Sequence, residues 1–207
     1  MSKEIKGVVN RLDLFTTPLW YVERDLPEGA YEWALDIEKN VEGREVSNKG
    51  GGYQSQELEF EKIPYYNIIK EMTAFLPPFY FGKPWLNINR KGHYNIKHTH
   101  PSCDLAAVWY ITDNMDKLFF EDPCYHARSL LLEKSGGNEI KSLDIKAGTL
   151  IMFPSDVSHW VEMNETNSPR ISLSFNMSFE IYGWNHITDD NHTIDRPIKE
   201  DLRLDFK

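Results

Sequence analysis

The second half of the chain alternates between apolar and polar positions. Between residues 171 and 179 every second side chain is large and apolar, and those in between are Ser or Asn. A strand with this pattern buries one face and presents small polar groups on the other. Several other segments are rich in β-branched and aromatic residues and are bounded by turn residues. We predict strands at Trp85–Arg90, Leu105–Thr112, Leu118–Glu121, Thr149–Phe153, His159–Glu162 and Arg170–Phe179.

The first 80 or so residues have a different pattern, which predicts two helices. Apolar residues recur at helical spacing through Glu28–Val41, after Pro27 in a first-turn position. A second helix is predicted to start at Pro64, to continue through Phe75 and to end before Pro77. Residues 49–53 contain three consecutive glycines and predict a flexible loop. They lack the Lys-Ser/Thr that follows a phosphate-binding loop.

These elements predict a mainly β protein with flanking helices, an α+β chain built around an antiparallel barrel or sandwich. A length of 207 residues with 41% apolar residues is sufficient for one domain with its own core. We expect residues 1–80 to form a helical and mixed support, residues 81–184 the β core, and residues 185–207 a polar C-terminal tail.

Charge and cysteine content narrow the class of protein. The net charge of −9 argues against a nucleic-acid partner held by phosphate contacts. Apolar runs such as Leu105–Ile111 are too short to span a bilayer, and the first residues show no signal-peptide pattern. We therefore expect a cytoplasmic protein without a membrane partner. Cys103 and Cys124 are interpreted as reduced thiols.

Three histidines are candidates for a metal site. His98 and His100 are two residues apart, so on a strand their imidazoles would point to the same face, and His159 could join them from a distant strand. Three protein ligands are enough for a catalytic metal with open positions, and neutral imidazoles suit iron, zinc or copper.

Arg170 and Ser172 are candidates for an anion site beside that metal. A buried guanidinium can bind a carboxylate through two parallel hydrogen bonds, and a hydroxyl two residues along the same strand face can add a third. This combination suits a dicarboxylate cosubstrate. The alternative is a surface arginine paired with an Asp or Glu.

The motifs together resemble those of a known family. The segments 85–87, 92–101, 107–110, 153–155 and 170–176, with His159, are similar to the iron(II) and 2-oxoglutarate-dependent oxygenases, in particular to an uncharacterised subgroup common in marine bacteria and their phages. Residues 14–20 resemble that subgroup's opening motif. The resemblance implies a single oxygenase domain with the double-stranded β-helix (jelly-roll, cupin-like) fold. For a phage protein, the location would be the host cytoplasm.

The resemblance also implies the chemistry. Fe(II) would be held by His98, His100 and His159, and 2-oxoglutarate would chelate it through its keto acid end while its distal carboxylate meets Arg170 and Ser172. With O2, the enzyme would hydroxylate an unidentified substrate and convert 2-oxoglutarate to succinate. Tyr110, Asn87 and Asn89 are further candidates for cosubstrate contacts, because predicted strands bring these polar residues near the mouth of the barrel. They could equally be ordinary half-buried strand residues.

One position departs from the family's commonest pattern and leaves alternatives open. An acidic residue usually stands two positions after the first histidine, where this chain has His100. Asp104 or water could complete the site instead, and Cys103 could belong to a closed zinc site. Two other classes therefore stay open: a three-histidine cupin-type metalloenzyme that does not use 2-oxoglutarate, and a non-catalytic barrel that acts as a binding module. The sequence leaves the primary substrate and the oligomeric state undetermined.

Overall fold

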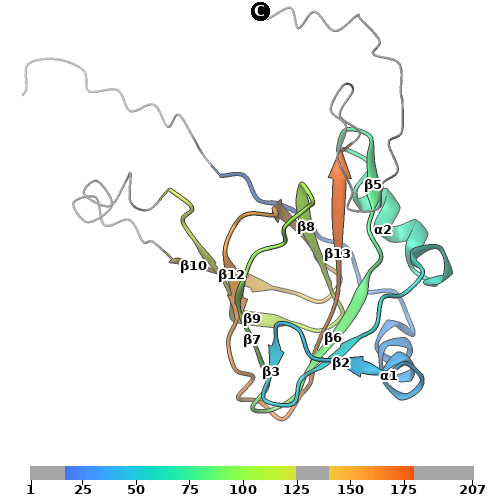
Figure 1. Ribbon diagram of the computed structural model, residues 1–207. Helices are drawn as coiled ribbons and strands as arrows, with labels where there is room; N and C mark the ends of the chain where they lie inside the picture. Colours follow the sequence, from blue (N-terminus) through green and yellow to red (C-terminus); the bar gives the residue numbers. More distant parts are fainter. Residues whose placement is uncertain (1–16, 125–139, 180–207) are drawn as a thin grey trace, which may run out of the picture.

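Two antiparallel sheets face each other in the computed structural model, which describes residues 17–124 and 140–179 (Figure 1). The larger sheet has the order β1-β11-β8-β13-β6-β4-β2, with β5 also paired to β13. Its strands are β1 (Trp20–Val22), β2 (Gly43–Arg44), β4 (Tyr53–Ser55), β5 (Phe79–Phe81), β6 (Trp85–Asn89), β8 (Leu105–Tyr110), β11 (Leu150–Pro154) and β13 (Arg170–Phe179).

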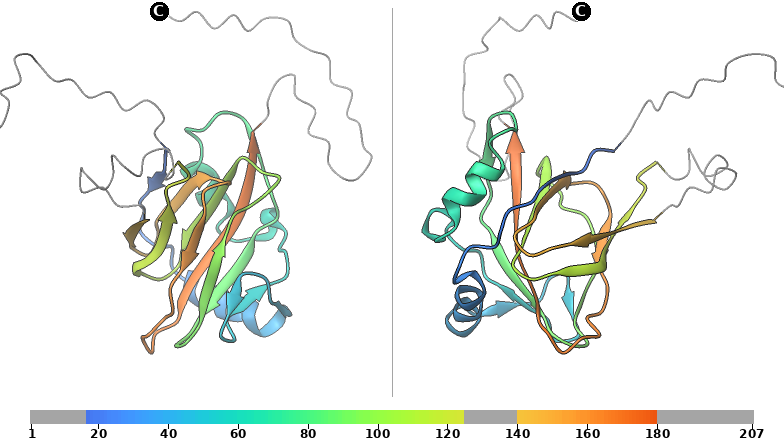
Figure 2. Two further views of the ribbon diagram at one scale, coloured as in Figure 1. Left: turned by 60° about the vertical axis from the view of Figure 1, so that its left-hand side comes forward. Right: turned by 180° about the vertical axis from the view of Figure 1, so that it is seen from behind.

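The smaller sheet has the order β10-β9-β12-β7-β3 and covers one face of the larger one (Figure 2). Its strands are β3 (Asn48–Lys49), β7 (Tyr94–His98), β9 (Asn114–Glu121), β10 (Ile140–Ile145) and β12 (His159–Val161). The prediction of a mainly β chain with antiparallel sheets is confirmed. The N-terminal part does more than support the core, because it supplies β1 to β5 to the two sheets. The predicted tail at 185–207 lies outside the described residues.

The side chains of β13 alternate between the two faces of the larger sheet. Ile171, Leu173 and Phe175 are fully buried on the outer face of the larger sheet, where they pack in a cluster with residues of both helices. The intervening Ser172 and Ser174 face the space between the sheets. A second, smaller apolar cluster fills part of that space; it consists of Ala106, Tyr110, Leu118, Phe120, Ile145, Ile151, Phe153 and Val157.

The helices are close to the predicted positions. Helix α1 (Ala30–Asn40) lies within the predicted 28–41, and α2 (Tyr66–Met72) is shorter than predicted; a single 3-10 turn, η1 (Phe60–Lys62), precedes it. The hydroxyl of Thr73 donates to the carbonyls of Ile69 and Lys70, and the chain then turns so that Phe75 is exposed. Helix α2 therefore ends before the last apolar residue of its pattern.

The glycine segment at 49–53 is a tight turn rather than the predicted flexible loop. Lys49 ends β3 in the smaller sheet and Tyr53 begins β4 in the larger one. Gly50 has a φ of 71°, and a Cβ there would lie 2.4 Å from the carbonyl oxygen of Gly92. Only glycine fits this position, where the turn connects the two sheets.

Candidate metal centre and adjoining pocket

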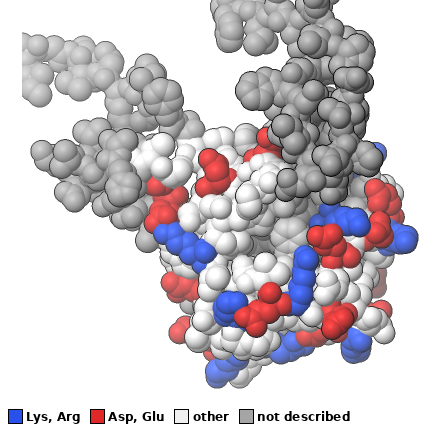
Figure 3. Space-filling model, in the orientation of Figure 1, with Lys and Arg blue, Asp and Glu red and all other residues white. Residues whose placement is uncertain are grey.

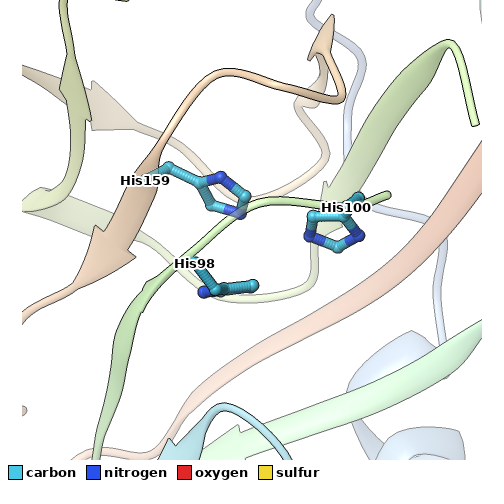
Figure 4. A group of neighbouring side chains, drawn as sticks. All are labelled: His98, His100 and His159. Atoms are coloured by element: carbon cyan, nitrogen blue, oxygen red, sulfur yellow. The ribbon is translucent and has the colours of Figure 1, made fainter. Parts of the chain in front are cut away.

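Three imidazoles meet at one end of the space between the sheets (Figure 4). His98 is the last residue of β7 and His159 is the first of β12, and the two residues are direct partners in the antiparallel pairing. His100 follows two residues later in the chain. One nitrogen from each ring can be chosen so that all three lie within 4.8 Å of one another.

The hydrogen bonds of His98 and His159 leave one nitrogen of each ring available. The Nδ1 of His98 lies 2.7 Å from the carbonyl oxygen of Ile96, and the Nδ1 of His159 lies 3.0 Å from that of Val157. A carbonyl oxygen only accepts, so in both rings Nδ1 carries the proton and donates. The unprotonated Nε2 is therefore free to bind a metal ion.

His100 reaches the cluster by a route that differs from the prediction. Strand β7 ends at His98, so alternation along a strand does not orient His100. Its backbone N–H donates to the carbonyl of Ser155 at 2.8 Å, and its Nδ1 lies 2.8 Å from the Oδ1 of Asn176. Its ring stacks on Trp85 with a centroid distance of 5.7 Å. Contacts with other strands and loops therefore direct its Nε2 toward the other two histidines.

Burial keeps the three imidazoles neutral. Desolvation, together with the repulsion that a protonated His98 would exert, lowers the pKa of His100 to about 4 and that of His159 to about 3. Desolvation also lowers the pKa of His98. Neutral imidazole is the form that ligates a metal, so the rings do not need to lose a proton first.

Neither of the alternative ligands joins the group. The Oδ2 of Asp104 accepts the backbone N–H of Phe179 at 2.7 Å, which commits this carboxylate to the end of β13. The thiol of Cys103 donates to the carbonyl of His100 at 3.3 Å. Among the residues that the structure describes, the group of potential ligands consists of the three histidines alone.

A pocket, partly open to solvent, extends from the histidines between the two sheets. All five predicted cosubstrate residues line it, namely Asn87, Asn89, Tyr110, Arg170 and Ser172. The pairing register explains their proximity: Ser172 of β13 lies between Asn87 of β6 and Tyr110 of β8, and Arg170 lies opposite Asn89. Five residues from three neighbouring strands thus face one cavity.

Arg170 is the charged group of this pocket. It is 8% exposed, its Nη2 donates to the carbonyl of Glu162 at 2.6 Å, and its Nε is buried without a hydrogen-bond partner. No Asp or Glu side chain pairs with it in the described part of the chain, and desolvation lowers its pKa to about 10. The alternative of a surface arginine with an acidic partner is therefore not what the structure shows.

The side-chain amides of the two pocket asparagines, Asn87 and Asn89, donate hydrogen bonds within the protein. The amide of Asn87 donates to Ser174 Oγ at 3.0 Å, and that of Asn89 donates to Asn95 Oδ1 at 2.6 Å. The Oδ1 of Asn89 is buried without a partner. Asn176, Trp85 and Ser155 lie in the segments that carry the family resemblance, but the sequence alone assigned none of them a role in the site. Asparagine is depleted in strands, so Asn176 among the small polar positions of β13 was the available signal.

The fold and the site together define a double-stranded β-helix protein with a three-histidine group at one end of its central pocket. Residues 83–176 match the protein family described as "Putative 2OG-Fe(II) oxygenase". This segment runs from just before β6 to Asn176 and includes every candidate site residue. The predicted resemblance to the iron(II) and 2-oxoglutarate-dependent oxygenases is confirmed. No curated protein sequence matches the chain.

Several solved structures share the fold at low sequence identity. HygX from Streptomyces hygroscopicus, with nickel, 2-oxoglutarate and hygromycin B bound, aligns with a TM-score of 0.58 at 11% identity, over 81% of this chain and 85% of HygX. The epimerase SnoN from nogalamycin biosynthesis gives a TM-score of 0.60 at 14% identity, over 79% of each chain. A Pseudomonas putida prolyl-4-hydroxylase gives 0.56 at 15% identity, over 80% of this chain and 94% of the hydroxylase.

None of the helices in the described residues is both long and apolar enough to cross a membrane. On the face shown in Figure 3, Lys and Arg side chains are interspersed with Asp and Glu, and the described part of this face has no extended basic surface.

Proposed function

We propose that the protein is an Fe(II)- and 2-oxoglutarate-dependent dioxygenase that hydroxylates its substrate. One observation carries the proposal: three neutral histidines with free Nε2 atoms and a buried, unpaired arginine line the same pocket. The family match and the shared fold support it.

The donor set fits iron. Three imidazole nitrogens suit Fe(II), and three protein ligands leave coordination positions open for cosubstrate and O2. His98, His100 and His159 would hold the ion. Because these ligands are neutral, the site keeps both positive charges of Fe(II), one more than a site with a carboxylate ligand would keep. The extra charge favours a chelating anion such as the keto acid end of 2-oxoglutarate.

Arg170 supplies the second charge that a dicarboxylate needs. Its side chain lines the pocket without an acidic partner among the described residues, and Ser172 lies on the same strand face two residues further along. Tyr110, Asn87 and Asn89 surround this end of the pocket. A three-histidine cupin that does not use 2-oxoglutarate would leave the buried arginine without a ligand. A 2-oxoglutarate-dependent dioxygenase gives this arginine a carboxylate to bind, so we favour that function.

When bound, iron and 2-oxoglutarate supply the oxidation: substrate R–H, O2 and 2-oxoglutarate give R–OH, succinate and CO2. The protein's own residues bind and orient these partners. Arg170 and Ser172 would bind the distal carboxylate, the three histidines would hold the metal that binds the keto acid end, and the apolar side chains Val108, Leu118 and Val161 would limit water in between.

Anaerobic calorimetry tests the proposal in two steps. Fe(II) should bind with a stoichiometry of one, and 2-oxoglutarate should then bind to the iron-loaded protein but not to the metal-free protein. Aerobic incubation with fractionated metabolites should release succinate together with a product 16 Da heavier than its precursor. Metal binding without 2-oxoglutarate binding would support the three-histidine cupin instead. No metal binding would support the non-catalytic module.

A further inference from the structure

The three histidines are not held in the same way. His98 and His159 are oriented by carbonyls two residues earlier in their own chain segments, so local backbone suffices. His100 lies beyond the end of β7, and its ring contacts two side chains of the larger sheet, Asn176 and Trp85. The orientation of His100 therefore depends on the opposite sheet.

The stacking contacts of His100 do not determine which of two orientations, related by a 180° turn, its ring adopts. Its ring lies nearly parallel to Trp85, at 18° and 5.7 Å between centroids, and to His159, at 16° and 5.1 Å. Parallel stacking sets the plane of the imidazole. It does not distinguish the ring from the same ring turned by 180°, which would exchange Nδ1 with a carbon. Only the 2.8 Å contact between Nδ1 and Asn176 Oδ1 distinguishes the two orientations.

We propose that Asn176 is a positioning residue for the third metal ligand: its side-chain oxygen accepts the Nδ1 proton of His100 and thereby presents Nε2 to the metal. This inference rests on the proposed function. A hydrogen-bond acceptor on the remote nitrogen of a ligating histidine fixes its tautomer and orientation, and its loss commonly weakens metal binding by about 10- to 100-fold.

Asn176 is itself held firmly. The backbone carbonyl of Asn176 accepts the backbone N–H of Gly82 at 2.8 Å, and a Cβ on Gly82 would lie 3.2 Å from that backbone oxygen. It pairs with Ala106 in β8 and lies on the same face of β13 as Arg170, six residues earlier. One strand thus carries both the carboxylate clamp and the support for the third ligand.

Titration with Co²⁺, an oxygen-stable probe, tests the proposal on the full chain. Asn176→Ala should weaken Co²⁺ binding by about 10- to 100-fold, whereas Asn176→Asp, which keeps an acceptor, should stay within about 3-fold of wild type. In a His100→Ala background, Asn176→Ala should have no further effect, because the residue acts through His100. The visible Co²⁺ spectrum of Asn176→Ala should shift toward that of His100→Ala.

A control and a variant-free measurement complete the test. Ser178→Ala, two residues further along β13, should leave Co²⁺ affinity unchanged. In the metal-free wild type, imidazole ¹⁵N shifts should show His100 protonated on Nδ1. Protonation on Nε2, or equal effects of Asn176→Ala with and without His100, would overturn the inference while leaving the proposed function intact. Failure of the wild type to bind Co²⁺ or Fe(II) would overturn both.

Discussion

Replacing Arg170 by methionine removes the proposed carboxylate clamp while keeping most of the side-chain volume. In the wild type this guanidinium is 8% exposed and has an unpartnered Nε. A bound carboxylate would complete its hydrogen bonds, and removing one partner of such a buried pair costs about 3–5 kcal/mol. At about 1.4 kcal/mol per tenfold change, Arg170→Met should raise the Kd for 2-oxoglutarate by at least about 100-fold.

The same substitution should not destabilise the protein without its ligands. Burial lowers the pKa of Arg170 well below its usual value, to about 10, which corresponds to a cost on the order of 3 kcal/mol for keeping the charge buried. Methionine removes this cost, and it also removes the hydrogen bond from the charged guanidinium to the carbonyl of Glu162, worth about 1.5–3 kcal/mol. We therefore expect a Tm equal to or above that of wild type.

The assay combines calorimetry of 2-oxoglutarate binding to Ni²⁺-loaded protein with thermal unfolding. At 100 times its wild-type Kd, 2-oxoglutarate should stabilise the wild type by about 2.7 kcal/mol and the variant by less than about 0.5 kcal/mol. Ni²⁺ affinity should be unchanged. Arg90→Met, which breaks an exposed ion pair with Glu38, is the matched control and should bind the cosubstrate normally. Equal 2-oxoglutarate affinity in Arg170→Met and wild type would refute the clamp.

Three further predictions concern the metal, the pocket and the fold. His98→Ala and His159→Ala should each abolish measurable Fe(II) binding in anaerobic titration, and full occupancy in either variant would remove that residue from the ligand set. Ser172→Ala should weaken 2-oxoglutarate binding by about 10-fold, the value of one hydrogen bond to a charged group, and an unchanged Kd would exclude the hydroxyl. Gly148→Ala should lower the free energy of unfolding by more than 3 kcal/mol, roughly the sum of backbone strain and steric overlap, because its Cβ would lie 1.9 Å from a backbone oxygen. Gly92→Ala, with the same φ of 88° but open space, should cost only about 1 kcal/mol; equal losses in denaturant unfolding would contradict this reading.

Most of the β core and the pocket-facing residues could be predicted from local sequence. The alternation in β13 places Ile171 and Leu173 on one face and Arg170 and Ser172 on the other, whatever the strand pairs with. The short strands β1 to β5 were not predicted, since elements of two or three residues carry almost no periodicity of their own. They form because a neighbouring edge is available to pair with.

The three-histidine group separates more sharply what local sequence predicts from what tertiary structure decides. Its residue types were readable in the chain, because closely spaced histidines, a distant third and a strand-borne arginine are a chemically specific set. The orientation of His100 was decided only by tertiary structure. It lies outside the strand whose alternation was expected to orient it, and Ser155, Asn176 and Trp85 hold it from elsewhere.

Local sequence therefore determined which side chains are available and which face of a strand they occupy, because alternation is a property of the extended backbone itself. The folded structure determined which faces meet. Asp104 stands six residues from His98, a separation that alternation alone allowed, yet its carboxylate binds the end of β13. His100 instead joins the cluster through contacts with residues 55 and 76 positions away. Such distant contacts exist only after the sheets have paired, so no local pattern could encode them.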